Sequence, residues 1–237
     1  MLLGLERVKQ HNLASFLQII GITGSVGKTT LKNLISFALK NYGKVYCSPH
    51  SYNNRFGVPL SLSNLKSNID YGVFEIGMDK KGEIDSLSKI VKPEIAIITN
   101  ISGAHFKNFN TLKDIAKAKA EIINNISKDG NIILNKDSKF FSLLSNKAKK
   151  NGINITSFSI KKKSDIFLLD VKKIKKRFRL KINIRNKILF FDTKYITDNF
   201  INNILACIAI MFVLNLNLNK MKKVFTSFKI PEGRGDV

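Results

Sequence analysis

A glycine-rich segment near the N-terminus has the residue types that bind a nucleoside triphosphate. It lies between an apolar run and an amphipathic run, and it comprises Gly24, Ser25, Val26, Gly27, Lys28, Thr29 and Thr30. Glycines let backbone N–H groups surround phosphate oxygens, the lysine reaches the β- and γ-phosphates, and the first threonine hydroxyl ligates Mg²⁺. A strict G-x-x-x-x-G-K-[ST] motif would need glycine at Ile22, whereas the glycine here is Gly21. The flanking strand and helix nevertheless favour a phosphate loop over a chance glycine-rich turn.

Two polar residues follow other apolar runs and are candidates for metal binding. Glu75 ends the run that begins at Tyr71, and His105 follows the run that ends near Ile101. Because ligands gather at the carboxyl ends of parallel strands, Glu75 is suited to hold Mg²⁺ beside the phosphate loop and His105 to serve a second metal. The alternatives are an edge carboxylate at a strand end and an ordinary surface histidine in a loop.

Lys119 falls on the apolar stripe of a predicted helix, four residues after Ile115 and three before Ile122. Burial would lower the pKa of its ammonium group, and the neutral amine could then take up carbon dioxide as a carbamate, which is an anionic metal ligand. The alternative is a lysine that extends past its neighbours to reach water. The spacing alone leaves both interpretations open.

Strands and helices must alternate to bring these residues together. The apolar patterns predict strands at 17–23, 44–48, 71–76, 94–101, 131–135 and 155–160, with helices at 28–42, 84–91, 111–127 and 138–150. Thr111 is the expected cap of its helix, with Asp114 three residues on. Several alternating strands follow over 166–196, then helices at 198–216 and 220–228. We therefore expect an α/β fold of the P-loop type: a mostly parallel sheet flanked by helices, with a small antiparallel sheet attached.

The composition bounds the class of protein. The chain has 237 residues, with 40 Lys and Arg against 17 Asp and Glu, and two cysteines. This excludes global disorder and a disulfide scaffold, and the longest apolar run, 204–214, is too short to span a bilayer, so we expect a buried helix in a cytoplasmic protein. A net charge of +23 could indicate a nucleic acid or membrane partner. The densest basic segment, 161–187, alternates with apolar residues as half-exposed strands with a solvated basic face do, and it lacks base-stacking aromatics.

Taken together and in this order, the motifs resemble those of the Mur ligases, the ATP-dependent amide-forming enzymes of peptidoglycan synthesis. The similar segments are 22–30, 52–59, 74–78, 99–105 and 115–121. The resemblance covers nearly the whole chain and corresponds to the central, ATP-binding domain of the family. Two segments, 53–59 and 116–121, look most like the member that adds D-alanyl-D-alanine to UDP-N-acetylmuramoyl-tripeptide.

The resemblance implies roles for individual residues. Lys28 and Thr29 would hold ATP and Mg²⁺, Glu75 would be a metal ligand, and His105 with a carbamylated Lys119 would serve a second Mg²⁺. Asn203 stands where the family has an adenine-contacting Asn, and Arg234 matches an Arg near the phosphates. ATP would phosphorylate the terminal carboxylate of the peptide, and the dipeptide amine would then displace phosphate from the acyl phosphate. Two departures bear on substrate or nucleotide contacts: Arg55 replaces a usual acid, and Phe200 replaces a frequent Asn.

The same resemblance divides the chain into three parts. Residues 1–15 would be the remnant of a UDP-substrate domain, 16–229 the central ATP-binding domain, and 230–237 the hinge to a missing C-terminal domain. We therefore expect a fragment that binds Mg-ATP and does not complete ligation alone, with a separate chain as one source of the missing domains. The alternatives are another Mur-type or folylpolyglutamate-type ligase, a P-loop ATPase associated with nucleic acid, and a non-catalytic partner subunit. On the ligase interpretation no nucleic acid partner and no membrane span are expected.

Overall fold

The computed structural model describes residues 17–103 and 108–231. Its core is one continuous sheet of nine strands in the order β2-β3-β1-β4-β5-β6-β7-β8-β9. The strands are β1 (Gln18–Thr23), β2 (Val45–Cys47), β3 (Tyr71–Glu75), β4 (Ile95–Ile98), β5 (Asn131–Asn135), β6 (Asn154–Ser159), β7 (Ile166–Ile174), β8 (Arg177–Ile184) and β9 (Lys187–Thr193). Neighbours from β2 to β7 pair in parallel, and β7, β8 and β9 pair antiparallel. The predicted α/β fold is confirmed, and its antiparallel part continues the main sheet through two paired positions between β6 and β7.

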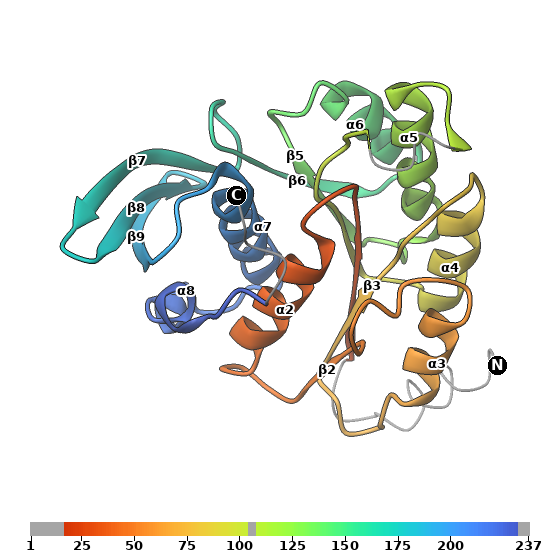
Figure 1. Cartoon of the computed structure of the whole chain (residues 1–237), viewed down its shortest axis with the longest axis horizontal. Helices are drawn as coiled ribbons and strands as arrows, with labels where there is room; N and C mark the ends of the chain where they lie inside the picture. The colour runs from red at the N-terminus through yellow and green to blue at the C-terminus, as the bar shows by residue number, and fades with distance from the viewer. Residues whose placement is uncertain (1–16, 104–107, 232–237) are drawn as a thin grey trace.

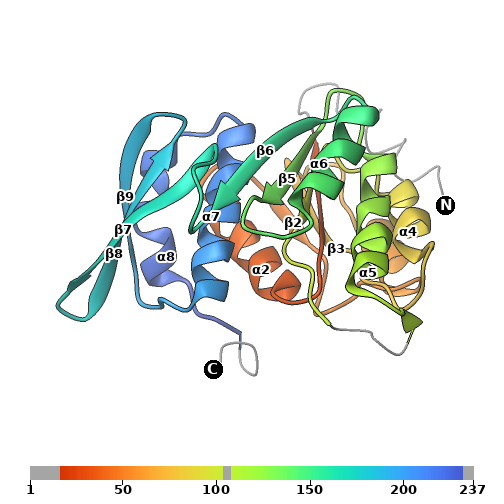
Figure 2. The ribbon, with the colours of Figure 1, turned by 90° about the horizontal axis from the view of Figure 1, so that it is seen from above.

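Helices cover both faces of the parallel part, as Figures 1 and 2 show. The helical segments are α2 (Lys28–Leu39), α3 (Gly57–Ser63), α4 (Glu83–Val91), α5 (Leu112–Lys119), η2 (Ala120–Asn125), α6 (Phe141–Lys150), α7 (Asp198–Val213), η3 (Leu218–Met221) and α8 (Val224–Ser227). One apolar core joins α2, α7 and α8 to the sheet, and the other joins α3, α4, α5 and α6 to the opposite face. Successive strand residues serve opposite cores: Ile19 packs in the second and Ile20 in the first, because strand side chains alternate.

Most predicted elements are present, with shifted ends. The helix predicted over 28–42 ends at Leu39, because the chain turns there and the N–H groups of Tyr42 and Gly43 both donate to the Leu39 carbonyl. The helix predicted over 111–127 begins as expected, with Thr111 Oγ1 accepting a hydrogen bond from the Asp114 N–H at 3.2 Å, but it tightens into the 3₁₀ segment η2 after Lys119. Helix α3 was not predicted from the sequence.

The long apolar helix predicted near the C-terminus is confirmed as a core element. Helix α7 has sixteen residues, and eleven of them are buried. None of the helices within the described ranges combines the length and the apolar character needed to cross a bilayer. The run is therefore apolar because α7 is buried in the core that it forms with α2, α8 and the sheet.

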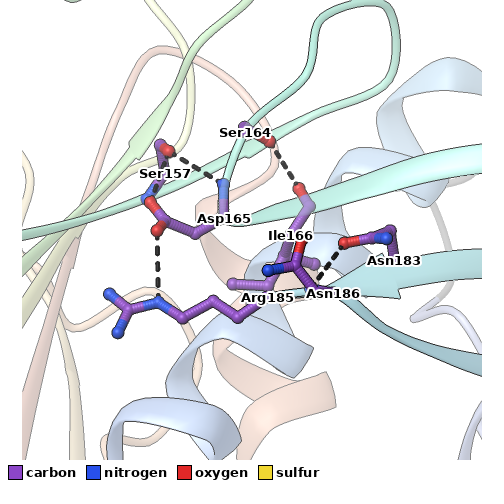
Figure 3. A network of polar contacts seen from close by, with 7 residues as sticks. All are labelled: Ser157, Ser164, Asp165, Ile166, Asn183, Arg185 and Asn186. Atoms are coloured by element: carbon purple, nitrogen blue, oxygen red, sulfur yellow. Dashed lines mark hydrogen bonds and ion pairs between the residues drawn. The ribbon is translucent and has the colours of Figure 1, made fainter.

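A polar network fixes the antiparallel strands to the parallel sheet (Figure 3). Asp165, just before β7, accepts hydrogen bonds from the Ser157 N–H at 2.9 Å and the Ser157 hydroxyl at 2.6 Å, and its other carboxylate oxygen accepts from Arg185 Nε at 3.2 Å. The Arg185 N–H also donates to the Asp165 carbonyl. Partial burial opposes the charge, but the hydrogen bonds from Ser157 and then the charge of Arg185 lower the pKa of the Asp165 carboxyl.

Candidate functional site

The phosphate loop, residues 24–30, links the carboxyl end of β1 to the first turn of α2. Its two glycines are required by the backbone. Gly24 has φ +147°, and a Cβ there would lie 1.9 Å from Thr99 Oγ1; Gly27 has φ +83° and is the N-cap of α2. The first N–H groups of α2 have no acceptors within the helix, so this turn presents donors to an anion. Lys28 Nζ donates to the Gly24 carbonyl at 3.0 Å, and its ammonium group therefore lies over the loop.

A second segment clasps the loop from the end of β4. The N–H groups of Ser25 and Val26 donate to the carbonyl and the side-chain oxygen of Asn100, at 3.0 and 2.8 Å. Thr99 Oγ1 donates to the Val26 carbonyl at 2.7 Å, and the Ser102 N–H donates to Ser25 Oγ at 3.0 Å. The segment 99–102 therefore fixes the loop conformation. Reasoning from the sequence did not select these residues as site residues, although they lie in the recognised motif 99–105.

Glu75 meets the phosphate loop across two neighbouring strands. It pairs with Ile22 in the β1–β3 ladder, and its carboxylate is buried, with 1% of the residue exposed. One carboxylate oxygen accepts a hydrogen bond from Thr29 Oγ1 and the other from Asn53 Nδ2, each at 2.7 Å. Asn53 belongs to the motif 53–59, but the sequence alone did not indicate a role for it in the site. The predicted proximity of Glu75 to the loop is confirmed.

This arrangement fits Mg²⁺. A carboxylate oxygen and a threonine hydroxyl 2.7 Å apart are hard oxygen donors, and they lie beside the helix turn that would hold phosphate oxygens. Across the described residues, no three His, Cys, Asp or Glu side chains cluster as metal ligands. A cation here would accordingly depend on phosphate oxygens and water as well as on Thr29 and Glu75, which is the usual manner of Mg²⁺ binding.

Lys119 is buried as the last residue of α5, with 1% exposed. Burial, and then the nearby charge of Lys28, lowers the pKa of its ammonium group from 10.5 to about 7. Within the described part of the chain it has no hydrogen-bond or ion-pair partner. The interpretation of a lysine that extends to water is therefore wrong, because Lys119 is buried. Its modification to a carbamate stays a prediction.

An open cleft of about 840 Å³ adjoins Lys28. The segments 53–56, 77–83 and 86–87 line it. Lys28, Arg55, Lys80 and Lys81 contribute positive charge, and Asp79 and Glu83 contribute negative charge. The guanidinium of Arg55 lies 4.8 Å from the ring centre of Phe56. An anionic substrate that reaches the phosphate loop from this side would meet a net positive wall.

A family model for the Mur ligase middle domain matches residues 22–211. The chain belongs to the Mur ligase family. It is 33% identical over 230 residues to the UDP-N-acetylmuramoyl-tripeptide--D-alanyl-D-alanine ligase of Rickettsia prowazekii (strain Madrid E). The aligned segment covers 97% of this chain and 51% of that protein. It is 36% identical over 218 residues to the ligase of the same name from Buchnera aphidicola subsp. Baizongia pistaciae (strain Bp), over 91% of this chain and 46% of that protein.

Solved structures agree with these sequence matches. A crystal structure of MurF from Acinetobacter baumannii superposes with a TM-score of 0.88 and 29% identity, over 98% of this chain and 50% of that one. A MurF ligase from Thermotoga maritima, solved in complex with ADP, shares the fold with a TM-score of 0.84 and 24% identity, over 98% of this chain and 53% of that one. The chain thus spans about half the length of the curated relatives it matches.

In this Mur ligase domain, Asn203 of α7 lies against the phosphate loop. Asn203 is 7% exposed, and a Cβ added to Gly27 of the loop would lie 3.4 Å from the Oδ1 atom of Asn203. Contact with adenine stays a prediction. Phe200, one turn earlier, is buried among aromatic rings, with centres 5.3 Å from Tyr195 and 6.2 Å from Phe228, so it serves the core of the domain. His105 and Arg234 lie outside the described residues, as do residues 1–15 and most of the predicted hinge.

Lys32 is a residue of the Mur ligase site region that sequence reasoning missed. It lies one turn after Lys28 and Thr29 on α2, and 1% of it is exposed. Its ammonium group donates to the carbonyl of Ser48 at 2.6 Å and to that of His50. Lys32 therefore ties the helix of the phosphate loop to the segment that leads to Asn53. Its spacing of four from Lys28 was the available signal, because residues four apart share one helix face.

Glu121, in the motif 115–121, has a structural place. Both its carboxylate oxygens accept from the Gly82 N–H at 3.0 Å, and one also accepts from the Asp85 N–H at 3.3 Å. An acceptor at the start of α4 satisfies donors that the helix leaves open. Glu121 thereby connects η2 to the segment 79–83 that lines the cleft.

Proposed function

We propose that this chain is the ATP-binding part of a ligase that joins UDP-N-acetylmuramoyl-tripeptide to D-alanyl-D-alanine. The observation that carries the nucleotide assignment is the buried Thr29–Glu75 pair, 2.7 Å apart beneath a phosphate loop. The substrate assignment is supported by the names of the two relatives that match over more than nine tenths of the chain. Because the chain spans about half of each relative, the remainder of the ligase would supply the other substrate contacts.

The proposed reaction has two steps. An oxygen of the terminal carboxylate of the tripeptide attacks the γ-phosphorus of ATP, and ADP leaves with the electrons of the broken P–O bond. The amine of D-alanyl-D-alanine then attacks the acyl carbon of the acyl phosphate, loses a proton, and expels inorganic phosphate. Both steps concentrate negative charge on phosphoryl and acyl oxygens, so positive groups held in place lower the barriers.

The residues of this chain would supply much of that positive environment. The N–H groups of the first turn of α2 bind phosphate oxygens, and Lys28 turns from the Gly24 carbonyl to the β- and γ-phosphates. Thr29 and Glu75 hold Mg²⁺, which neutralises phosphate charge when bound. Asn53 keeps the Glu75 carboxylate in place through its second oxygen.

Lys119 would act as a carbamate, and His105 would join it at a second Mg²⁺. The support is the buried position of Lys119 and the pKa of about 7 of its ammonium group, which makes a neutral amine available near neutral pH. The carbamate would turn a cation beside Lys28 into an anion and so remove the repulsion between the two lysines. Asn203 would contact the adenine, and Arg234 the phosphates.

A chimeric ligase tests the proposed substrates. Residues 22–211 of this chain replace the matching segment of the Rickettsia ligase, and phosphate release is measured with and without each substrate. We expect release that needs ATP, the UDP-linked tripeptide and D-alanyl-D-alanine together, and none with Lys28→Ala. Binding of Mg-ATP by the unmodified 237-residue chain is measured alongside, so that a chimera that fails to fold does not leave the proposal untested.

Three results would contradict the proposal. The first is a folded chimera that ligates glutamate to a folate in preference to D-alanyl-D-alanine. The second is ATP hydrolysis by the unmodified chain that DNA or RNA strongly stimulates in a salt-sensitive way. The third is the absence of Mg-ATP binding by the unmodified chain.

A further inference from the structure

The strands β7, β8 and β9 present one face away from the rest of the molecule. Their inner face packs on α7 and α8 through buried residues such as Leu180, Ile182 and Phe191. The register places the alternate residues on the other face, which we call the outer face: Phe167, Asp170, Lys172, Ile174, Arg177, Arg179, Lys181, Asn183, Ile188, Phe190 and Asp192. The hairpin of β7 and β8 projects beyond the helices in both views (Figures 1 and 2).

Large apolar side chains are exposed on this extension. Ile174, Ile188 and Phe190 lie on the outer face and are 39%, 47% and 52% exposed, and Leu169, at the bulge of β7, is 43% exposed. They account for four of the ten large apolar residues that are exposed across the described residues, although the three strands form a small part of the chain. The alternation of this segment predicted half-exposed strands with a solvated basic face, and the structure shows that exposed apolar side chains also lie on that face.

The same face is strongly positive. Lys172, Arg177, Arg179 and Lys181 lie on the outer face, and the turn between β7 and β8 adds the two exposed lysines Lys175 and Lys176. The acids on the face are already paired: Asp192 accepts from Arg179 at 2.7 and 3.0 Å, and Asp170 lies 3.9 Å from Lys172. An excess of positive charge therefore surrounds the exposed apolar side chains.

We propose that the outer face of β7–β9 docks on an anionic lipid bilayer. Cations that alternate with exposed apolar side chains suit such a surface, because lysine and arginine meet the lipid phosphates while isoleucine, leucine and phenylalanine enter the headgroup layer. A protein partner would instead favour a contiguous apolar centre with a polar rim. Single-stranded nucleic acid would favour several stacking aromatics, whereas Phe190 is accompanied here by aliphatic side chains.

Co-sedimentation of the 237-residue chain with vesicles tests the proposal. The vesicles contain phosphatidylcholine alone or with about one third phosphatidylglycerol, and the expected gain per basic residue at such a surface corresponds to about five-fold in affinity. We expect binding to the anionic vesicles only. The Lys175→Glu/Lys176→Glu variant should bind at least about 30-fold more weakly, since each reversal removes an attraction and adds a repulsion.

Matched controls separate this face from the high charge of the whole chain. Lys149→Glu/Lys150→Glu makes the same charge change at two exposed positions of α6, and we expect it to weaken binding by less than about three-fold. Phe190→Ser keeps the charge, and it should remove the part of the binding that persists at about 0.5 M salt. Both Lys175→Glu/Lys176→Glu and Phe190→Ser should bind Mg-ATP as the unmodified chain does, which also shows that they fold.

The proposal is overturned by any of three results. The unmodified chain fails to bind anionic vesicles, or the α6 pair weakens binding as much as the β7–β8 pair, or Phe190→Ser leaves the salt-resistant binding unchanged. Binding of duplex DNA or of an acidic polypeptide that depends on Lys175 and Lys176, with no vesicle binding, would assign the face to that partner instead.

Discussion

Replacement of Lys119 by methionine should stabilise the domain and change how its stability depends on pH. Methionine has a similar length and keeps the apolar contacts of a site that is 1% exposed, but it has no charge to bury. In the folded chain the pKa of the Lys119 ammonium is about 7, against 10.5 for an ordinary lysine. At pH 7 this difference corresponds to a cost of ~4 kcal/mol, as an order of magnitude.

The direction of the pH dependence follows from how many protons the folded and unfolded chains bind. Between pH 7 and 10.5 the unfolded chain keeps a proton on Lys119 that the folded chain has largely lost, so the free energy of unfolding should rise with pH across this window. Below pH 7 both states are protonated and the full cost of burial applies. Lys119→Met should therefore be more stable than the unmodified chain at pH 7, and the two should converge as the pH approaches 10.5.

Urea denaturation at pH 7 and about pH 9.5, in buffers free of carbon dioxide, measures this difference. Lys117→Met is the matched control, because Lys117 lies on the same helix and is exposed, and its stability should stay within about 0.5 kcal/mol of the unmodified chain. A Lys119→Met variant that is less stable than the unmodified chain at pH 7, or pH profiles that run parallel, would refute the reasoning.

The same pKa predicts reactivity with carbon dioxide. At pH 7 about half of the Lys119 amines are neutral, compared with about one in 3,000 for a lysine of pKa 10.5. With ¹³C-labelled bicarbonate, a carbamate signal in the NMR spectrum should be present in the unmodified chain and in Lys117→Met and absent in Lys119→Met. A signal of equal strength in all three would show that Lys119 is not the modified residue.

Three further predictions concern the support of the site and of the sheet. Gly24→Ala should weaken Mg-ATP binding at least about ten-fold, because the new Cβ would lie 1.9 Å from Thr99 Oγ1 at a position with positive φ. Titration with a fluorescent ATP analogue measures the affinity. An unchanged affinity would contradict the loop geometry. Lys32→Met should lower the free energy of unfolding by about 2–4 kcal/mol, because the carbonyls of Ser48 and His50 lose a charged donor. Urea denaturation measures this change, and Lys40→Met, at an exposed position at the end of the same helix, is the control. Equal effects in the two variants would contradict the prediction. Asp165→Asn should lower the free energy of unfolding by about 1 kcal/mol at pH 7. The lowered pKa of Asp165 stabilises the folded chain above the ordinary pKa of 3.8, and this stabilisation is lost as the pH falls through the pKa of Asp165 in the folded chain. The variant should therefore lose less stability in acid, and an unchanged acid profile would contradict the prediction.

The parts of the fold that depend on neighbours in the sequence could be predicted. Strands buried on both faces give continuous apolar runs, and helix caps such as Thr111 use residues three apart, so their signals lie within one short window. The position of Glu75 beside the loop could also be predicted, because parallel strands bring their carboxyl ends to the same edge.

The parts that depend on distant segments could not. Lys32 binds carbonyls 16 and 18 residues further along, and that contact exists only once β2 has packed beside β3. The hydrogen bond from the Val26 N–H to the Asn100 side chain likewise joins residues that are 74 positions apart. Helix α3 is seven residues long and depends on the Asn54 side chain, which accepts hydrogen bonds from the N–H groups of Phe56 and Gly57, so it has little periodicity of its own.

We propose above that Glu75 and Thr29 hold the Mg²⁺ of a bound ATP. Isothermal titration of the 237-residue chain with ATP, with Mg²⁺ and with chelator, tests it directly for the unmodified chain and for Glu75→Gln, whose amide can still pair with Thr29. We expect Mg²⁺ to strengthen ATP binding at least about ten-fold in the unmodified chain, and we expect Glu75→Gln to remove this gain without changing the affinity for ATP in chelator. An equal gain from Mg²⁺ in both proteins would contradict it.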